Sequence, residues 1–588
     1  MSTLLRTPFE GTKRLVVAID IGTTYTAASF CILKPGLIPK FEEILSWPKQ
    51  VVADAKVPSV IYYDVDGEAC AFGAETEDED RIFEAEENAW VKAEWWKLYL
   101  RPDHLPLIRG LELPELPPNT TVDDIFEDFL RFVKLQIQLC IQKSYADGLK
   151  LWNTLYPSMV VVLTTPNGWE GIQQDRMRRA AIQAELVDAD GGRRVRFVTE
   201  AEAAVLYAAN TGSVEDWLVD GGNIILCDCG GGTIDITAYT IRQTNPLRLE
   251  ESSAPQCYLA GGVHVSNEAK TYFSGRLVGT EWDNVDAIRR ITDNFDRGAK
   301  KAFCDPSKPS YIQLDGHKND AALGIVRGRM KVSGEDIASF FRPSIDGIIN
   351  GLNHAWENGN RLADKVIIVG GLAGSPYVYD EILRWGARVG VSISRPDGPS
   401  TKAVANGALA WHLDCSVSAR VARYDYGIEI GGLYDANVPE MADRKRIRDP
   451  YDGLEYVHHL WSCIVSKDAK IKGKKEFSSS YWRPIGMEDK MEFSQPILAF
   501  RKLNAPKFIY FDDGYRLLPG FEILCSVEFN LQRAWDAAPV QISKINGAIY
   551  KDVWFTIHLT LVDTEVTARA SWLENGVVVY SPAVITYD

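Results

Sequence analysis

Two glycine turns, each preceded by an aspartate, carry residue types that suit phosphate binding. The first reads DIGTT at 20–24 and follows an apolar run at 15–19; the second reads DCGGGT at 228–233 and follows an apolar run at 224–227. Glycine lets backbone N–H groups approach an anion closely, and aspartate offers hard oxygen to Mg²⁺. One such turn alone most often serves only as a turn. Two of them in one chain predict a clamp around a phosphorylated ligand.

The elements around these turns predict an α/β fold in two related halves. Strand-like runs at 159–164 and 195–200 alternate with helix-like segments at 173–186 and 201–209. The strand–turn–strand pattern of the N-terminus returns at the second turn. A third glycine turn, GGLAGSP at 370–376, follows another apolar run. The sequence contains no P-loop motif, and no GxGxxG segment opens a helix after a strand, so these two other phosphate-binding solutions are not used.

In order and spacing, the three turns resemble the phosphate-1, phosphate-2 and adenosine motifs of the superfamily of actin, hexokinase and the seventy-kilodalton heat-shock proteins. The heat-shock family matches best, because DCGGGTID at 228–235 is similar to its DxGGGTxD motif and VTEAEAA at 198–204 resembles its connecting helix. The segments 370–376 and 423–427 resemble the divergent twelve-type branch of that family. The resemblance covers roughly residues 14–430.

The resemblance implies a two-lobed actin-like ATPase fold, built from duplicated ribonuclease-H-like domains and followed by a β-rich C-terminal domain. The expected boundaries are 14–218 for lobe I with a return segment at 395–420, 219–394 for lobe II, and 421–588 for the C-terminal domain. The segment TKAVANGA at 401–408 resembles the helix by which the superfamily re-enters its first lobe. Short alternating runs at 508–511, 521–529 and 553–561 are typical of a β-rich unit.

Family roles transfer to individual residues. By resemblance, Asp20 and Asp228 hold a hydrated Mg²⁺, whereas Glu200 and Asp235 orient the attacking water. Phosphoryl transfer needs positioning and charge neutralisation, so a lysine near the γ-phosphate is expected as well. Lys97 is the expected counterpart, Lys92 is its competitor, and a solvated helix charge is the alternative for either. The implied catalytic residues are Asp20, Lys97, Glu200, Asp228, Thr233 and Asp235.

Nucleotide contacts are also implied by the resemblance. The residues expected to wrap the β- and γ-phosphates are Gly22, Thr23, Thr24, Tyr25, Gly230, Gly231, Gly232 and Thr233. On the adenosine side the expected contacts are Lys300, Gly370, Gly371 and Ser375. The serine and arginine of the main family fall here on Leu372 and Gly374. An adenine-stacking arginine is therefore missing, which bears on nucleotide affinity and base selectivity.

The amino-acid composition limits the classes of partner that this chain is expected to bind. The chain has 588 residues, a formal charge of −16 and 46% hydrophobic residues, which suits several globular domains rather than one core. The acidic balance disfavours nucleic acid and anionic membranes. The acidic run ETEDED at 75–80 is expected to be a solvated face, or else to dock a basic partner. With no run near the roughly 18 apolar residues of a membrane-spanning helix and with scattered cysteines, a cytoplasmic protein is expected.

The implied function is Mg²⁺-dependent binding and slow hydrolysis of ATP to ADP in a chaperone-like ATPase, with polypeptide clients or co-chaperones as partners. Three alternatives stay open: a pseudo-ATPase scaffold that binds nucleotide without turnover, a small-molecule kinase of the same superfamily, and an actin-like filament protein.

In the C-terminal domain, the aromatic side chains Trp482, Tyr510 and Trp554 are expected to pack in a core, with a binding groove as the alternative.

Overall fold

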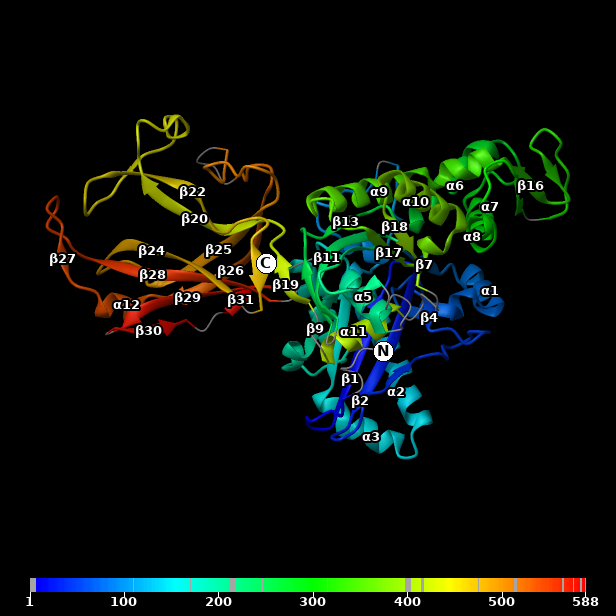
Figure 1. The fold of residues 1–588 in the computed structure, drawn as a ribbon, viewed down its shortest axis with the longest axis horizontal. Coiled ribbons are helices and arrows are strands. Elements are labelled where there is room, and N and C mark those ends of the chain that lie inside the picture. The colour runs from blue at the N-terminus through cyan, green and yellow to red at the C-terminus, as the bar shows by residue number, and fades with distance from the viewer. Residues whose placement is uncertain are drawn as a thin grey trace. The chain divides into compact units, whose positions relative to one another are not determined.

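The computed structural model describes residues 7–108, 110–169, 171–210, 217–244, 247–314, 316–396, 403–413, 417–473, 475–511, 516–562, 565–574, 576–581 and 584–586. The chain forms two compact units, one of residues 1–169 with 176–418 and one of residues 170–175 with 419–588 (Figure 1). Within the described ranges, every helix is too short or too polar to span a bilayer.

The first lobe of the N-terminal unit is built on a sheet with the strand order β3-β2-β1-β8-β9. β1 (Arg14–Ile21) runs antiparallel to β2 (Tyr25–Leu33) and parallel to β8 (Val160–Thr165). β9 (Val195–Thr199) and β3 (Phe41–Glu43) form its two ends. Every residue of β1 after Arg14 is buried, which is typical of a strand covered on both faces.

The second lobe repeats this plan with the order β18-β17-β10-β11-β12. β10 (Asn223–Cys229) is antiparallel to β11 (Ile234–Thr244) and parallel to β17 (Lys365–Val369). β18 (Ser392–Ser394) and β12 (Leu247–Glu251) flank these three strands. Each strand of the first sheet thus has a counterpart of the same direction in the second. The predicted two-lobed, actin-like α/β fold is confirmed.

The helices follow the same duplication. α2 (Val122–Ser144) and α9 (Gly334–Asn358) join the third and fourth strands of their lobes, and α4 (Ile172–Gln183) and α10 (Pro376–Val389) join the fourth and fifth. α5 (Glu200–Asn210) and α11 (Ala403–Leu413) follow the fifth strands and share one apolar core with residues of both sheets. Residues 401–402 of the predicted re-entry helix lie outside the described residues.

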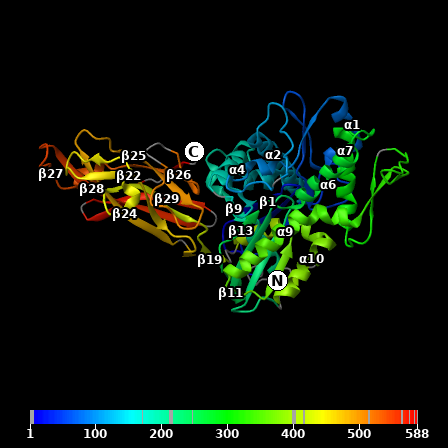
Figure 2. The same ribbon diagram turned by 90° about the horizontal axis from the view of Figure 1, so that it is seen from above.

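Smaller elements extend each lobe beyond its sheet. In the first lobe these are β4 (Lys56–Pro58), β5 (Ile61–Tyr63), β6 (Ala69–Phe72), η2 (Gly73–Glu77), α1 (Glu79–Glu87), β7 (Val91–Ala93), η3 (Trp96–Leu100) and α3 (Gly148–Leu155). In the second lobe they are β13 (Gln256–Tyr258), α6 (Gly262–Arg276), α7 (Val285–Arg297), α8 (Ala299–Ala302), β14 (Ser310–Gln313), β15 (Ile325–Val326) and β16 (Arg329–Val332). α6 and α7 lie side by side (Figures 1 and 2).

The stability of the N-terminal unit is expected to depend on pH through His264 on α6. Its side chain is buried, and burial lowers its pKa to about 4. The unfolded chain therefore binds a proton that the folded chain does not, so stability is lost as pH falls from about 6.5 to about 4. Relative to His264→Asn, the wild type should lose about 1.4 kcal/mol between about pH 7.5 and about pH 5.5. Urea titrations of both proteins at the two pH values measure this difference, and equal losses would contradict it.

The C-terminal unit consists of two packed sheets. One has the order β21-β22-β20-β25-β26-β31 and the other the order β24-β28-β29-β30, with β27 beside β28. Their bounds are β20 (Asp425–Leu433), β21 (Ile447–Arg448), β22 (Glu455–Val465), β24 (Glu476–Gly486), β25 (Glu492–Phe500), β26 (Phe521–Asn530), β27 (Gln541–Ile542), β28 (Ile549–Val562), β29 (Glu565–Glu574), β30 (Val577–Tyr580) and β31 (Val584–Thr586). Ile497 and Val527 of one sheet and Val553 and Ile557 of the other belong to the core of this unit. β19 (Val417–Val421) pairs with β23 (Lys470–Lys472), and α12 spans Gln532–Ala537.

Two predictions for this unit are wrong. Trp482 and Trp554 do not pack in the core: they are 43% and 61% exposed and face each other across β24 and β28, with ring centroids 6.4 Å apart. Strand alternation explains this, because the adjacent residues Val553 and Phe555 take the inward positions. Tyr510 is half-buried. The run 508–511 forms isolated bridges rather than a strand, since Phe508 pairs with Leu460 whereas Tyr510 pairs with Leu517.

Candidate functional site

Two hairpin turns of the same geometry connect the first two strands of each lobe. In the first turn, the Gly22 N–H donates to the Tyr25 carbonyl at 3.0 Å; in the second, the Gly230 N–H donates to the Thr233 carbonyl at 2.9 Å. A Cβ on Gly22 would lie 2.3 Å from the Tyr25 carbonyl oxygen, so a larger residue would break this turn. The repeat seen in the sequence is therefore a repeat of backbone structure.

The two turns touch each other. A Cβ added to Gly231 would lie 2.4 Å from Thr24 Oγ1, and one added to Gly232 would lie 2.3 Å from Thr23 Oγ1. The N–H groups of 261–263 donate to the carbonyls of the second turn at 2.8 to 3.1 Å and hold it from behind. The glycines thus bring the backbones of the two lobes together where the sequence predicts a phosphate clamp.

Three carboxylates converge next to the turns. Asp20 lies near the end of β1, Asp228 lies near the end of β10, and Glu200 begins α5; all three are buried. Burial raises the pKa of Asp228 to about 7, with further contributions from the negative charges of Glu200 and Asp20. Burial raises the pKa of Glu200 as well, although the Lys97 ammonium opposes this. The concentrated negative charge would be relieved by a cation.

Lys97 reaches this carboxylate cluster. Its Nζ lies 2.6 Å from Glu200 Oε1 and 5.4 Å from the centre of the Trp169 ring, and its side chain is only 3% exposed. The alternative of a solvated helix charge is therefore wrong for Lys97. Lys92 lies nearer the solvent and pairs instead with Glu94 at 2.9 Å. Both lysines line the same pocket, but Lys97 is the one that contacts a predicted catalytic carboxylate.

Asp235 occupies a different place from the other predicted catalytic residues. It pairs with Asp228 in the β10–β11 register and accepts a hydrogen bond from the Asn167 N–H at 2.5 Å. Its side chain is buried but does not line the pocket. The structure therefore places Asp235 behind the carboxylate cluster. Asn167, which sequence reasoning missed, follows β8 in a Pro-Asn-Gly turn, a position that could have drawn attention to it.

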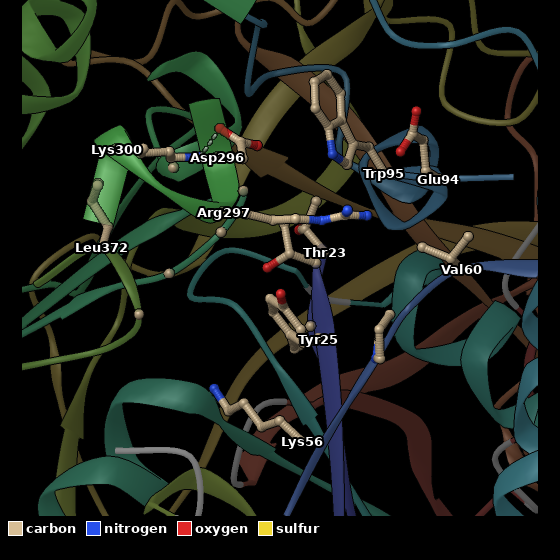
Figure 3. Close-up of a pocket in the computed structure, with 18 of the residues that line it drawn as sticks. Thr23, Tyr25, Lys56, Val60, Glu94, Trp95, Asp296, Arg297, Lys300 and Leu372 are labelled. Carbon is tan, nitrogen blue, oxygen red and sulfur yellow. Dashed lines mark ion pairs between the residues drawn. The ribbon is translucent and has the colours of Figure 1, made fainter. Parts of the chain in front are cut away.

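A single pocket of about 850 Å³ collects the remaining predicted residues (Figure 3). This volume lies within the range of small-molecule sites in proteins. The predicted residues that line it are Asp20, Gly22, Thr23, Thr24, Tyr25, Lys97, Glu200, Asp228, Gly230, Gly231, Gly232, Thr233, Lys300, Gly370, Gly371 and Ser375. The structure thus brings together residues that lie up to 355 positions apart, from Asp20 to Ser375, on both lobes.

The third glycine turn lines the pocket at the end where the sequence predicts adenosine contacts. Gly370 has a φ of +94°, and a Cβ there would lie 2.4 Å from Asp228 Oδ1, so this turn lies against the second one. Gly371 and Gly374 have open space where a side chain would project. Leu372 lines the pocket in place of the polar residue that the main heat-shock family would have.

Of the polar side chains at this end of the pocket, Lys300 already has partners in the protein and Ser375 does not. Lys300 Nζ donates to Ser266 Oγ at 2.7 Å and pairs with Asp296 Oδ1 at 3.2 Å (Figure 3). Ser375 precedes α10 and is buried, and its hydroxyl has no hydrogen-bond partner among the described residues. A buried hydroxyl without a partner calls for a ligand or water. Ser375 and Lys300 are therefore suited to contact a bound molecule.

Other pocket residues were not among the predicted contacts. Lys56, Trp95 and Arg297 line the pocket, although Trp95 lies two residues before Lys97 and Arg297 lies in the segment 296–304, which resembles the family helix that contacts the nucleoside. The acidic run at 75–80 is not simply a solvated face, because Glu77 and Glu79 also line the pocket. These residues come from segments that only the folded chain brings to the cleft.

Asp20 and Asp228 are of the residue type that would hold a hydrated Mg²⁺. Among the described residues, no three His, Cys, Asp or Glu side chains are placed to hold a metal ion. Mg²⁺ usually keeps several waters and binds through one or two carboxylates plus phosphate oxygens. Burial and the neighbouring carboxylates raise the pKa of Asp228, and the positive charges of Lys56 and Lys97 oppose this only in part, so a bound cation would favour the ionised carboxylate. Asp20 and Asp228 could supply the two carboxylates.

Comparisons with known proteins agree with this geometry. The chain is 21% identical over 568 residues to Heat shock 70 kDa protein 12B of Homo sapiens, covering 81% of this chain and 79% of the relative. It is 21% identical over 557 residues to Heat shock 70 kDa protein 12A of Mus musculus, covering 79% and 78%. No family model matches the chain. The predicted resemblance to the twelve-type branch is confirmed, and it supports a nucleotide-binding, ATPase-like function in general terms.

Proposed function

We propose that this chain binds ATP with Mg²⁺ between its two lobes and hydrolyses it slowly to ADP and phosphate. The chain is similar to the twelve-type heat-shock 70 kDa proteins over about four fifths of its length. The observation that carries the proposal is the contact between the two glycine turns beside Asp20, Asp228 and the Lys97–Glu200 pair. Two glycine turns in contact, without buried charged residues beside them, would be explained by their structural role alone. The charges add the groups that phosphoryl transfer needs.

The proposed reaction assigns a task to each group. The N–H groups of the two turns bind the β- and γ-phosphate oxygens, and Mg²⁺ supplies charge neutralisation when bound. A water oxygen bonds to the γ-phosphorus while the bond from that phosphorus to the bridging oxygen breaks, and its electron pair stays on ADP. Glu200, held in place by Lys97, accepts the proton of the water. Asp235 supports this arrangement from behind through Asn167.

The chaperone part of the proposal concerns the C-terminal unit. Two tryptophans exposed side by side on a sheet surface are suited to contact a partner protein, because indole rings combine apolar area with a donor. We propose that polypeptide clients or co-chaperones bind this unit and that the bound nucleotide changes their affinity. The alternatives of a pseudo-ATPase and of a small-molecule kinase predict different products, which the same experiment separates.

Calorimetry of ATP and ADP binding, with and without Mg²⁺, tests the proposal for the wild type and for Asp20→Ala and Asp228→Ala. The wild type should bind both nucleotides, and each variant should lose about tenfold in Mg²⁺-dependent affinity, because one carboxylate of the cation site is gone. Single-turnover assays on the same samples should give ADP and phosphate.

Each alternative has its own outcome in this experiment. Binding without turnover would favour the pseudo-ATPase scaffold, and turnover only with an added phosphate acceptor would favour a kinase. No binding of either nucleotide by the wild type would refute the proposed site. Client peptides whose affinity is the same with ATP and with ADP would refute the coupling part alone.

A further inference from the structure

The pocket contains a positively charged side chain, Arg297, that the protein does not use in a hydrogen bond or ion pair among its described residues. It is the last residue of α7, its side chain is exposed, and it lines the pocket. It makes no hydrogen bond or ion pair with another residue in the described part of the chain. In Figure 3 its guanidinium extends toward the side of Trp95 and Glu94, away from Leu372 and Lys300. The Arg297 guanidinium is therefore open to a molecule bound in the pocket.

Most other cations of the pocket are paired. Lys97 pairs with Glu200, Lys300 with Asp296, and Lys92 with Glu94. On α7 itself, Arg289 pairs with Asp286, one turn earlier. A guanidinium whose donors are not used by the protein is suited to bind the oxygens of an anionic ligand in a bidentate manner.

The charge of Arg297 acts on the opposite lobe. Burial and the charge of Glu77 raise the pKa of Tyr25, whereas the positive charge of Arg297 lowers it. Tyr25 closes the first glycine turn through its carbonyl. The Arg297 guanidinium of the second lobe is thus close enough to the Tyr25 phenol of the first lobe to influence it. In the view of Figure 3 the guanidinium lies between the labelled side chains of Trp95 and Thr23, and Thr23 belongs to the first glycine turn.

We propose that Arg297 is a catalytic residue that binds the γ-phosphate from the second lobe and neutralises the charge that develops on its oxygens during hydrolysis. This inference rests on the proposed function and extends it. The bond changes are those given above: water adds to the γ-phosphorus and ADP leaves with the electron pair of the broken bond. Arg297 exchanges no proton in this step. It contributes charge and two parallel N–H donors.

The test compares Arg297→Ala, Arg297→Lys and a matched control. Arg276 is also an exposed arginine in the last turn of a second-lobe helix, but it does not line the pocket. Arg276→Ala therefore reproduces the loss of charge at a helix end without touching the site. Arg297→Ala should lower the single-turnover rate at saturating Mg²⁺ and ATP about 30-fold, less than the loss of a buried donor because Arg297 is exposed.

Arg297→Lys should recover part of this loss, since charge is kept but the bidentate geometry is not. ADP affinity should change less than about threefold in all three variants, because ADP lacks the γ-phosphate. Arg276→Ala should behave as the wild type. Circular dichroism and thermal unfolding of each variant check that the fold is intact.

Two results would overturn the assignment while leaving the proposed function standing. One is an unchanged single-turnover rate for Arg297→Ala. The other is an equal loss of ATP and ADP affinity with an unchanged rate at saturation, which would make Arg297 a nucleoside or β-phosphate contact. A wild type that binds no nucleotide would instead refute the proposed function, and this inference with it.

Discussion

Replacing Lys97 with alanine is expected to lower the single-turnover rate of ATP hydrolysis by about 10² to 10³. The ammonium is buried, lies 2.6 Å from Glu200 Oε1 and packs over Trp169, so solvent cannot replace its charge. Its loss removes a positive charge from a site that already contains three carboxylates. Burial and the neighbouring Asp20 already raise the pKa of Glu200, and without Lys97 this pKa should rise further, leaving less carboxylate to accept a proton.

Lys92→Ala is the matched control for this experiment. Lys92 lines the same pocket but pairs with Glu94 rather than with the carboxylate cluster, so its loss should change the rate less than about threefold. A rate that falls for Lys92→Ala and not for Lys97→Ala would reverse the assignment of the two lysines. Rates measured at saturating ATP, with calorimetric affinities alongside, separate an effect on the chemical step from an effect on binding.

The sequence predicted the fold and most of the pocket because both are encoded locally. An apolar strand, an aspartate and a glycine turn specify a hairpin whatever surrounds it, and the chain contains this pattern once in each lobe. The duplication then implies that the two hairpins face each other. Lys97 was harder to identify, because its short helical segment has no motif and only its burial against Glu200 and Trp169 distinguishes it from Lys92.

The predictions that are wrong, or that place a residue differently, depend on contacts between distant segments. Trp482 and Trp554 have the composition of core residues, and only the strand register shows that they point outward. Asp235 belongs to the second motif, but its partner is Asn167 in the other lobe, 68 positions away. Arg297 lines the pocket because α7 ends there, whereas the local resemblance at 296–304 singled out only Lys300 as a contact.

Among the glycines that the structure describes, Gly407 at the contact between α5 and α11 has the least room for a side chain. A Cβ added to Gly407 on α11 would lie 1.8 Å from the carbonyl oxygen of Ala203 on α5, and the atom in the way belongs to the backbone, so no rotamer change can relieve the clash. The two helices would have to move apart. α5 begins with Glu200, and a shift of this helix would therefore also move the carboxylate that Lys97 holds. One glycine would thus affect both the stability and the proposed turnover.

Gly407→Ala is expected to lower the free energy of unfolding of the N-terminal unit by about 3 kcal/mol, the upper end for overpacking, despite the better helix propensity of alanine. Gly275→Ala on α6 is the control: it has nothing within 4 Å of the added Cβ, so its stability should stay within about 1 kcal/mol of the wild type or rise. Urea titration of both variants measures the difference. If Gly407→Ala unfolds at the same urea concentration as Gly275→Ala, the helices are not in the close contact described, and the position of Glu200 must be fixed by other packing.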